Sequence, residues 1–239
     1  MIPQFQLALM MLTRLPAGRI SGDVPTLAQS VWAFPIVGLL VGGVGAVPLL
    51  LAQGFGLSVT MAAGLSLLAM TLATGALHED GLADFADSFG TADRARKLEI
   101  MRDSRIGSYG VLALVLVVGL RWVAIGEAPV LALLVATVVS RAAVPFALHL
   151  MPPARSDGLG AAAAGNVSRV HLAINSVVAL GFACLLGTSG VIVVGIAAMA
   201  SLIVCGIAMR KLGGQTGDVL GAMVVLSETA ALIAVTGLL

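Results

Sequence analysis

Long apolar runs alternate with short polar stretches along almost the whole chain. A helix that spans a bilayer needs about 20 mainly apolar residues, within a range of roughly 17 to 25. The pattern therefore predicts an all-α fold, a polytopic transmembrane helical bundle of about seven spans. We expect these spans at residues 30–52, 57–77, 108–126, 129–150, 172–187, 190–209 and 219–238.

Two parts of the pattern depart from simple spans. The apolar run at 2–13 is too short to cross a bilayer, so we expect an interfacial or partly buried helix there that is ended by Pro16 and Gly18. The span at 172–187 is short and can instead form a hairpin with the next one. We expect a single integral membrane domain over residues 1–239, with further helices in its loops.

Composition agrees with a membrane protein. Of the 239 residues, 59% are hydrophobic and 10% are charged, whereas a soluble domain carries about 25% charge. The net charge of +1 gives no indication of a nucleic-acid partner. Cys184 and Cys205 lie inside apolar runs without ligand-spaced neighbours, which favours packed hydrophobic roles. The sequence contains no GxSxG or GxxxxGK[ST] motif.

Basic residues predict the topology. Eleven of the 13 Lys and Arg residues lie before the first span or in the loops 74–107, 151–171 and 210–218. Because positive loops stay in the cytoplasm, we expect these loops on the cytoplasmic side and the C-terminus outside. Arg121 is expected to reach the outer interface. Arg141 lies within a span, where a substrate-binding role and a buried structural ion pair are equally favoured.

The charged segment at 74–107 carries the candidate chemistry. Seven of the 12 acidic residues lie between Glu79 and Asp103. Asp80, Asp84 and Asp87 stand at i, i+4 and i+7, on one face of a helix. Stacked carboxylates repel each other unless a cation lies among them, and hard oxygen ligands suit Mg²⁺. The alternative is a solvated acidic face near a helix start, but the apolar surroundings favour the metal site.

Two further stretches are expected on the same face. Asp103-Ser104-Arg105-Ile106-Gly107 brings a carboxylate, a hydroxyl and a guanidinium to the start of a span, and Arg forks suit phosphate oxygens. Gly213-Gly214-Gln215-Thr216-Gly217-Asp218 offers backbone amides to an anion, and the alternative is a helix-capping turn with Asp218 as the N-cap. Together they indicate Mg²⁺-assisted chemistry on a phosphorylated substrate at the membrane face.

Several of these stretches resemble the cobalamin synthase family, the adenosylcobinamide-GDP ribazoletransferases of bacteria. Ala76 and Glu79 depart from the pattern of that family, where a second Gly and an apolar residue are frequent. The stretches that carry the resemblance are Thr13-Arg14-Leu15-Pro16, Phe34-Pro35-Ile36-Val37-Gly38, residues 74–90, Glu99 to Gly107, and Gly213 to Asp218.

The resemblance implies a Mg²⁺-dependent reaction at the bacterial cytoplasmic (inner) membrane. α-Ribazole or its 5′-phosphate is joined to adenosylcobinamide-GDP, and GMP leaves. On this basis we expect Asp80, Asp84 and Asp87 to be catalytic and metal-binding, with Glu79 as an additional candidate ligand. Asp103 and Arg105 are expected to be catalytic as well. The residues expected to bind substrate are Arg102, Ser104, Arg141, Gly214, Gln215, Thr216 and Asp218.

Two other functions remain open at the level of sequence. Another membrane phospho-alcohol or prenyl transferase would use the same acidic metal site with a different acceptor. An ion transporter would need carboxylates deep in several spans, for which Glu228 is the main candidate. The sequence leaves assembly into a homo-oligomer open, and it does not identify which carboxylate acts as general base.

Overall fold

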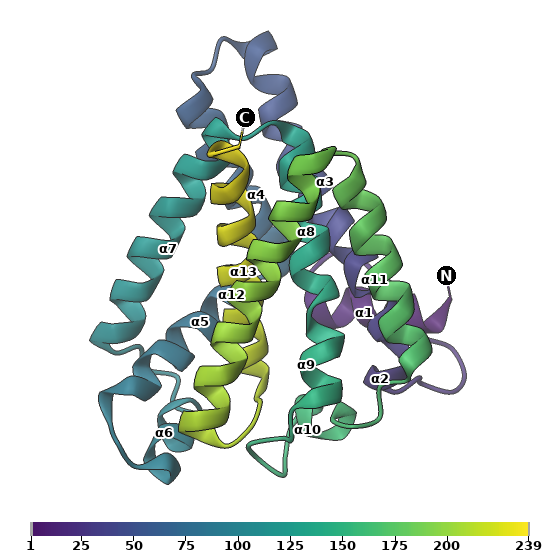
Figure 1. Cartoon of the computed structure of the whole chain (residues 1–239), viewed down its shortest axis with the longest axis vertical. Coiled ribbons are helices and arrows are strands. Elements are labelled where there is room, and N and C mark those ends of the chain that lie inside the picture. Colours follow the sequence, from purple (N-terminus) through teal and green to yellow (C-terminus); the bar gives the residue numbers. More distant parts are fainter. Residues whose placement is uncertain (1, 239) are drawn as a thin grey trace.

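The computed structural model describes residues 2–238, and within that range every regular element is a helix (Figure 1). This confirms the all-α class. The longer helices are α3 (Phe34–Leu51), α4 (Val59–Thr74), α7 (Ser108–Glu127), α8 (Val130–Ala142), α11 (Arg169–Cys184), α12 (Thr188–Leu212) and α13 (Gly217–Thr236). The shorter elements are α1 (Pro3–Leu12), α2 (Leu27–Ser30), α5 (Leu77–Asp87), α6 (Arg94–Ile100), α9 (Val144–Leu150), α10 (Leu159–Ala163) and the 3₁₀ turns η1 (Val31–Ala33), η2 (Ala52–Phe55) and η3 (Ser88–Gly90).

Fewer helices than predicted are long enough to cross a membrane. Helices stand near all seven predicted positions, but α4 and α11 have only 16 residues each, or about 24 Å. The pair α4 and α5 counts as one further span only if its 87° bend is included. In the described range, five segments have the length and apolar character of a span: Leu27–Leu51, Ser108–Glu127, Val130–Leu150, Thr188–Leu212 and Gly217–Thr236.

Helix α13 lies at the centre of the bundle, where it packs against α5, α7, α8 and α12. Met223 and Leu232 on this helix are fully buried. The predicted short helix at the N-terminus is present as α1, which packs against α2 and α3. A central apolar helix surrounded by other apolar helices is the expected arrangement when lipid, rather than water, covers the outside.

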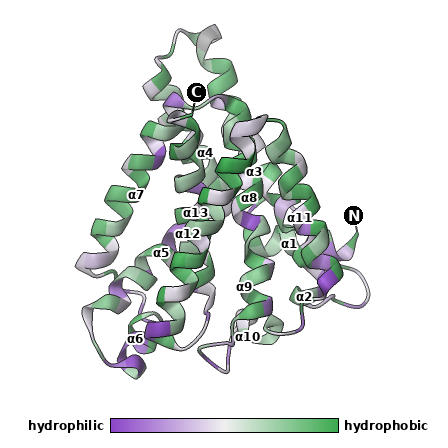
Figure 2. Ribbon diagram, in the orientation of Figure 1, coloured by the Kyte–Doolittle hydropathy of each residue, from purple (hydrophilic) through white to green (hydrophobic). Residues whose placement is uncertain are grey.

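Hydrophilic residues gather at one end of the molecule, around α6 (Figure 2). This end contains the loops 88–107, 151–168 and 213–216, and we call it the basic end. The loops join there because Ala154 N donates to Gln215 O at 2.8 Å and Gln215 N donates to Pro152 O at 2.9 Å. Arg94, from the loop 88–107, donates to Ala154 O at 3.1 Å, so all three loops form one continuous surface.

The junction between α4 and α5 sets the direction of the acidic segment. Gly75 and Ala76 both have left-handed backbone conformations, with φ of 65° and 57°. These two residues turn α5 away from α4 by 87°. Within residues 2–238, Ala76 is the one non-glycine residue with a positive φ, a conformation that costs an L-residue about 1–2 kcal/mol.

We expect Ala76→Gly to stabilise the protein by about 1 kcal/mol, because glycine adopts the left-handed conformation without a steric penalty. Ala69→Gly is the matched control inside α4, where the same change should destabilise by about 1 kcal/mol. Thermal unfolding in detergent measures both. Destabilisation by both substitutions would contradict the strained turn.

Candidate functional site

Helix α5 places its acidic residues beside the first turn of α13. Gly81 makes the close approach possible, since a Cβ atom at this position would lie 2.8 Å from the carbonyl oxygen of Asp218. On the apolar side of α5, Leu82 and Phe85 are buried. The packing brings Asp218 next to the face that carries Asp80 and Asp84.

Asp84 lies within a concentrated negative field. Helix α5 is not one of the five spanning segments, and Asp84 is only partly buried. Burial, followed by the charges of Asp80, Asp218 and Asp87, raises the pKa of Asp84 from 3.8 to about 7. Arg155 is the cation that opposes this effect, and its Nη2 donates to Asp218 Oδ2 at 3.1 Å. We call Asp80, Asp84, Asp218 and Arg155 the acidic site.

The acidic site fits a hard divalent cation that is completed by substrate. Carboxylate oxygens are preferred Mg²⁺ ligands, and the mutual repulsion on Asp84 is what a cation would relieve. In residues 2–238, no three His, Cys, Asp or Glu side chains converge tightly enough to hold a metal by themselves. Mg²⁺ is commonly bound by one or two carboxylates together with substrate phosphates and water.

Asp87 has a different environment from Asp80 and Asp84. Its Oδ2 accepts from Gly107 N at 2.7 Å, and its Oδ1 accepts from Gly110 N at 2.8 Å. Gly107 is the N-cap of α7, so a carboxylate from α5 satisfies free amides at the start of another helix. A Cβ at Gly110 would lie 2.4 Å from Asp87 Oδ2, so only glycine leaves room there. The observed role of Asp87 is to join α5 to α7.

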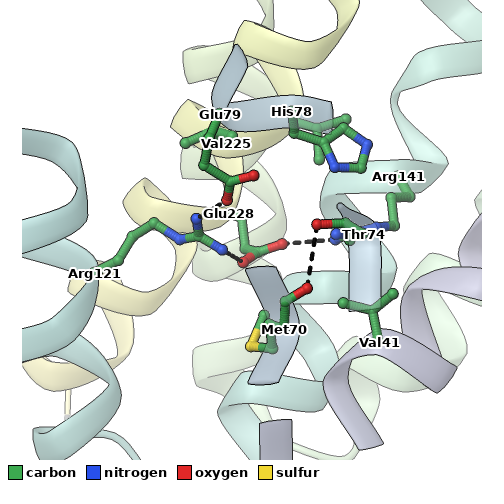
Figure 3. Close-up of a pocket in the computed structure, with 10 residues that line it drawn as sticks. Val41, Met70, Thr74, His78, Glu79, Arg121, Arg141, Val225 and Glu228 are labelled. Carbon is green, nitrogen blue, oxygen red and sulfur yellow. Dashed lines mark hydrogen bonds and ion pairs between the residues drawn. The ribbon is translucent and has the colours of Figure 1, made fainter. Parts of the chain in front are cut away.

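Glu79 and Arg141, which were predicted to bind metal and substrate, lie in the interior of the bundle (Figure 3). Arg121 Nη1 donates to Glu79 Oε1 at 2.6 Å, and Arg121 Nη2 donates to Glu228 Oε1 at 2.5 Å. Arg141 Nη1 donates to Glu228 Oε2 at 2.6 Å. This is the buried ion-pair alternative for Arg141. Arg121 does not reach the interface, because its side chain is only 3% exposed.

The segment 102–105 lies on the surface of the basic end. Arg105 and Asp103 pair with each other at 2.7 Å, and the hydrogen bonds from Arg105 hold the pKa of Asp103 below its usual value. Arg102 donates through Nη2 to both carboxylate oxygens of Asp157 at 2.7 Å, which joins two loops. Ser104 is exposed. These groups are accessible, and their predicted roles toward substrate stay predictions.

The glycine loop mainly connects the loops and caps α13. A Cβ at Gly214 would lie 2.3 Å from Pro152 O, and buried Gln215 donates through Nε2 to Gly160 O at 2.9 Å. Thr216, rather than Asp218, is the N-cap of α13, where its Oγ1 accepts from Val219 N. The expectation that this loop meets the acidic helix is supported by the packing of Asp218 on Gly81.

Three basic residues have roles that sequence reasoning missed. Arg155 belongs to the acidic site, although its stretch Pro152-Pro153-Ala154-Arg155 carries no motif. Arg94 donates to Leu212 O at 2.6 Å and to Ala154 O at 3.1 Å. Lys97 is buried and donates to the carbonyls of Ser88 and Thr91. The contacts of Arg155 and Arg94 join loops that are distant in sequence, whereas those of Lys97 close the loop that precedes its own helix.

Comparison with known proteins identifies relatives along almost the whole chain. A family model described as cobalamin-5-phosphate synthase matches residues 4–236. Relatives named adenosylcobinamide-GDP ribazoletransferase include one from Mesorhizobium japonicum, 43% identical over 95% of this chain and 90% of its own length. Another from Bradyrhizobium diazoefficiens is 44% identical over 92% and 88%, and one from Klebsiella pneumoniae is 39% identical over 98% and 99%. No solved structure matches the chain.

The position of Asp87 predicts a stability effect. Asp87→Ala should lower the free energy of unfolding by about 1–3 kcal/mol at any Mg²⁺ concentration, because two amides at the start of α7 lose their acceptor. Asp93→Ala is the control, since Asp93 caps the short exposed helix α6 and its loss should cost less. Thermal unfolding with and without Mg²⁺ measures both. An effect of Asp87→Ala that appears only when Mg²⁺ is present would show a metal ligand instead of a cap.

Proposed function

The chain belongs to the cobalamin-5-phosphate synthase family, and from this premise we propose that it joins α-ribazole or its 5′-phosphate to adenosylcobinamide-GDP. The products are adenosylcobalamin or its 5′-phosphate, and GMP. The observation that carries the proposal is the acidic site, in which carboxylates from α5 and α13 meet one guanidinium at the edge of the bundle. This combination suits a diphosphate with a divalent cation.

Asp80 and Asp84 are the proposed Mg²⁺ ligands, with Asp218 as a third carboxylate beside them. When bound, Mg²⁺ would neutralise the diphosphate of the substrate and favour the departure of GMP. Asp87 and Glu79 are outside this proposed set, because Asp87 Oδ1 and Oδ2 and Glu79 Oε1 already accept other hydrogen bonds.

The residues of the chain orient the reacting groups. The Arg155 guanidinium, held at Asp218, binds phosphate oxygens through its remaining N–H groups. A hydroxyl of the ribazole ribose attacks the phosphorus next to the cobinamide. A new O–P bond forms, the P–O bond to GMP breaks, and one carboxylate of the acidic site accepts the hydroxyl proton. Exposed Arg102, Ser104 and Arg105 lie at the basic end, where they meet the anionic parts of the substrates.

The apolar helices make this a multi-pass membrane protein, and we propose that its basic end faces the cytoplasm. Eight of the 13 Lys and Arg residues lie in the loops of that end or in the last turn of α12 directly before them, as the positive-inside rule requires for cytoplasmic loops. Both substrates are polar and one carries an anionic diphosphate, so they suit a site at the edge of the bundle that is reachable from water. The inner membrane of a bacterium is the corresponding location.

The reaction can be tested directly with purified protein. Protein in detergent is incubated with adenosylcobinamide-GDP, α-ribazole 5′-phosphate and Mg²⁺, and products are separated by chromatography. We expect one GMP for each cobamide formed and no product after chelation of Mg²⁺ by EDTA. Transfer to a lipid alcohol without cobamide formation would contradict the proposal. Activity that EDTA does not affect would exclude a requirement for Mg²⁺.

Asp84→Asn should lower the turnover number by at least about 100-fold, because loss of even an outer-shell partner of a metal costs about 10–100-fold. The variant should stay folded, since Asp84 is only partly buried and the change relieves repulsion. Asp23→Asn is the control and should keep full activity, because Asp23 is exposed and distant in sequence from the acidic site. Near-normal turnover of Asp84→Asn at saturating Mg²⁺ would exclude Asp84 as a ligand.

A further inference from the structure

Four charged side chains form a closed cluster inside the bundle (Figure 3). Glu79 comes from α5, Arg121 from α7, Arg141 from α8 and Glu228 from α13. Two guanidinium groups meet two carboxylates, so the formal charge of the cluster is zero. The side chains are 11%, 3%, 2% and 1% exposed, respectively. We call these four residues the ion cluster.

The ion cluster has no space for solvent. The pocket that it lines, together with His78 and Thr74, is too narrow to admit a water molecule. Arg121 Nε, Arg141 Nε and Glu79 Oε2 have no hydrogen-bond partner among the described residues. Outside the cluster, Arg141 Nη1 also donates to Thr137 O at 3.1 Å and to Ser140 Oγ at 3.2 Å. These groups carry no formal charge, so removal of one member would leave an uncompensated charge in an apolar interior. The four helices that carry these charges must therefore occupy defined positions relative to each other.

Glu79 is the member that connects the ion cluster to the acidic site. It precedes Asp80 directly in the chain and stands in the first turn of α5. The preceding turn at Gly75 and Ala76 breaks the helix, so the direction of α5 is not determined by α4 alone. Arg121 holds Glu79 from the side of α7, while Gly81 rests on Asp218 on the side of α13. Helix α5 is thereby fixed between two spanning helices.

We propose that the Glu79–Arg121 ion pair is a positioning device that holds α5 so that Asp80 and Asp84 face Asp218. Glu79 and Arg121 act through the acidic residues and do not touch the substrate. The inference rests on the proposed function for its link to Mg²⁺, but the placement of α5 can be measured without any activity.

The test compares two double variants that both keep the cluster neutral. Glu79→Leu/Arg121→Met removes the pair that holds α5 and leaves Glu228 with Arg141. Glu228→Leu/Arg141→Met removes the other pair and leaves Glu79 with Arg121. Each variant exchanges one buried Arg and one buried Glu for apolar side chains. A general loss of stability would therefore affect both in a similar way.

The first measurement is hydrogen exchange of peptides that cover α5, in detergent and without substrate. We expect Glu79→Leu/Arg121→Met to increase exchange in residues 77–87 by about tenfold or more, as for a helix that opens locally. The second double variant should leave exchange in this segment close to that of the unchanged protein. Equal exchange of α5 in all three proteins, or equal acceleration in both variants, would overturn the inference.

The second measurement is the Mg²⁺ concentration that gives half-maximal transfer. Glu79→Leu/Arg121→Met should raise it by about tenfold, the usual effect of losing a partner that orients metal ligands. An unchanged value together with faster α5 exchange would contradict the link between positioning and metal. If transfer does not depend on Mg²⁺ at all, the proposed function fails, while the exchange result still decides whether the pair positions α5.

A milder pair of substitutions keeps the inference testable if the apolar variants do not fold. Glu79→Gln/Arg121→Gln removes both charges, keeps the side-chain length at position 79, and replaces the guanidinium by a shorter amide that is still a hydrogen-bond donor. It should increase α5 exchange by a smaller factor than the apolar pair. Arg121→Lys, which keeps the charge, should restore protection toward that of the unchanged protein. If the protection of α5 from exchange depends on neither hydrogen bonding nor charge at position 121, the positioning role of the ion pair is excluded.

Discussion

The neutral ion cluster in the apolar interior is the constraint on which the arrangement of the bundle depends. Burial of an ion costs several kcal/mol unless its partners are close and well oriented. The four ions come from α5, α7, α8 and α13. Each of these helices must therefore have a defined rotation about its own axis and a defined shift along that axis, so that the ions meet. Apolar packing alone is more permissive, since Ala, Val and Leu surfaces tolerate small shifts between helices. The charges therefore supply specificity that the surrounding apolar residues do not.

Close contacts at two glycines then fix the position of α5 at the acidic site. Gly81 allows α5 to rest on the first turn of α13, and Gly110 leaves space for the carboxylate of Asp87 at the start of α7. In both places a methyl group would force the helices apart. Helix α5 is consequently fixed at its beginning by the Glu79–Arg121 ion pair and at its middle by backbone contact with α13. At its end it is fixed by Asp87, which caps the start of α7. Asp80 and Asp84 lie between these fixed points, which gives two repelling carboxylates a defined position.

The helices were predictable from the sequence because a bilayer allows few alternatives. Exposed backbone groups have no partners in lipid, so long apolar runs must be helical, and the predicted positions agree with the observed helices. Their lengths were less predictable. The run 57–77 loses its last residues to the turn at Gly75 and Ala76, which depends on local backbone conformation rather than on hydropathy. The 16 residues of α11 are similarly fewer than full spans require.

The candidate site was only partly predictable for a related reason. Spacing within one helix placed Asp80 and Asp84 on a common face, and the family motifs identified the loop that contains Asp218. Contacts between segments distant in sequence leave no such periodic signal. The partnership of Arg155 with Asp218 spans 63 residues, and that of Arg121 with Glu228 spans 107. Asp87 had the spacing of a ligand, but its oxygens face the amides of another helix, which spacing alone does not reveal.

The ion cluster and the acidic site also distinguish an enzyme from an ion transporter on physical grounds. An ion pathway requires deep carboxylates that exchange ions with water, whereas Glu228 is 1% exposed and bound by two guanidinium groups. Its negative charge is already compensated, and the narrow pocket beside it leaves no space for a hydrated ion. The carboxylates that repel each other lie instead where α5 meets the start of α13, with Asp80 exposed and Asp84 partly exposed. A cation that binds there can be shared with an anionic substrate from water, which is the requirement of phosphoryl-type transfer and not of transport.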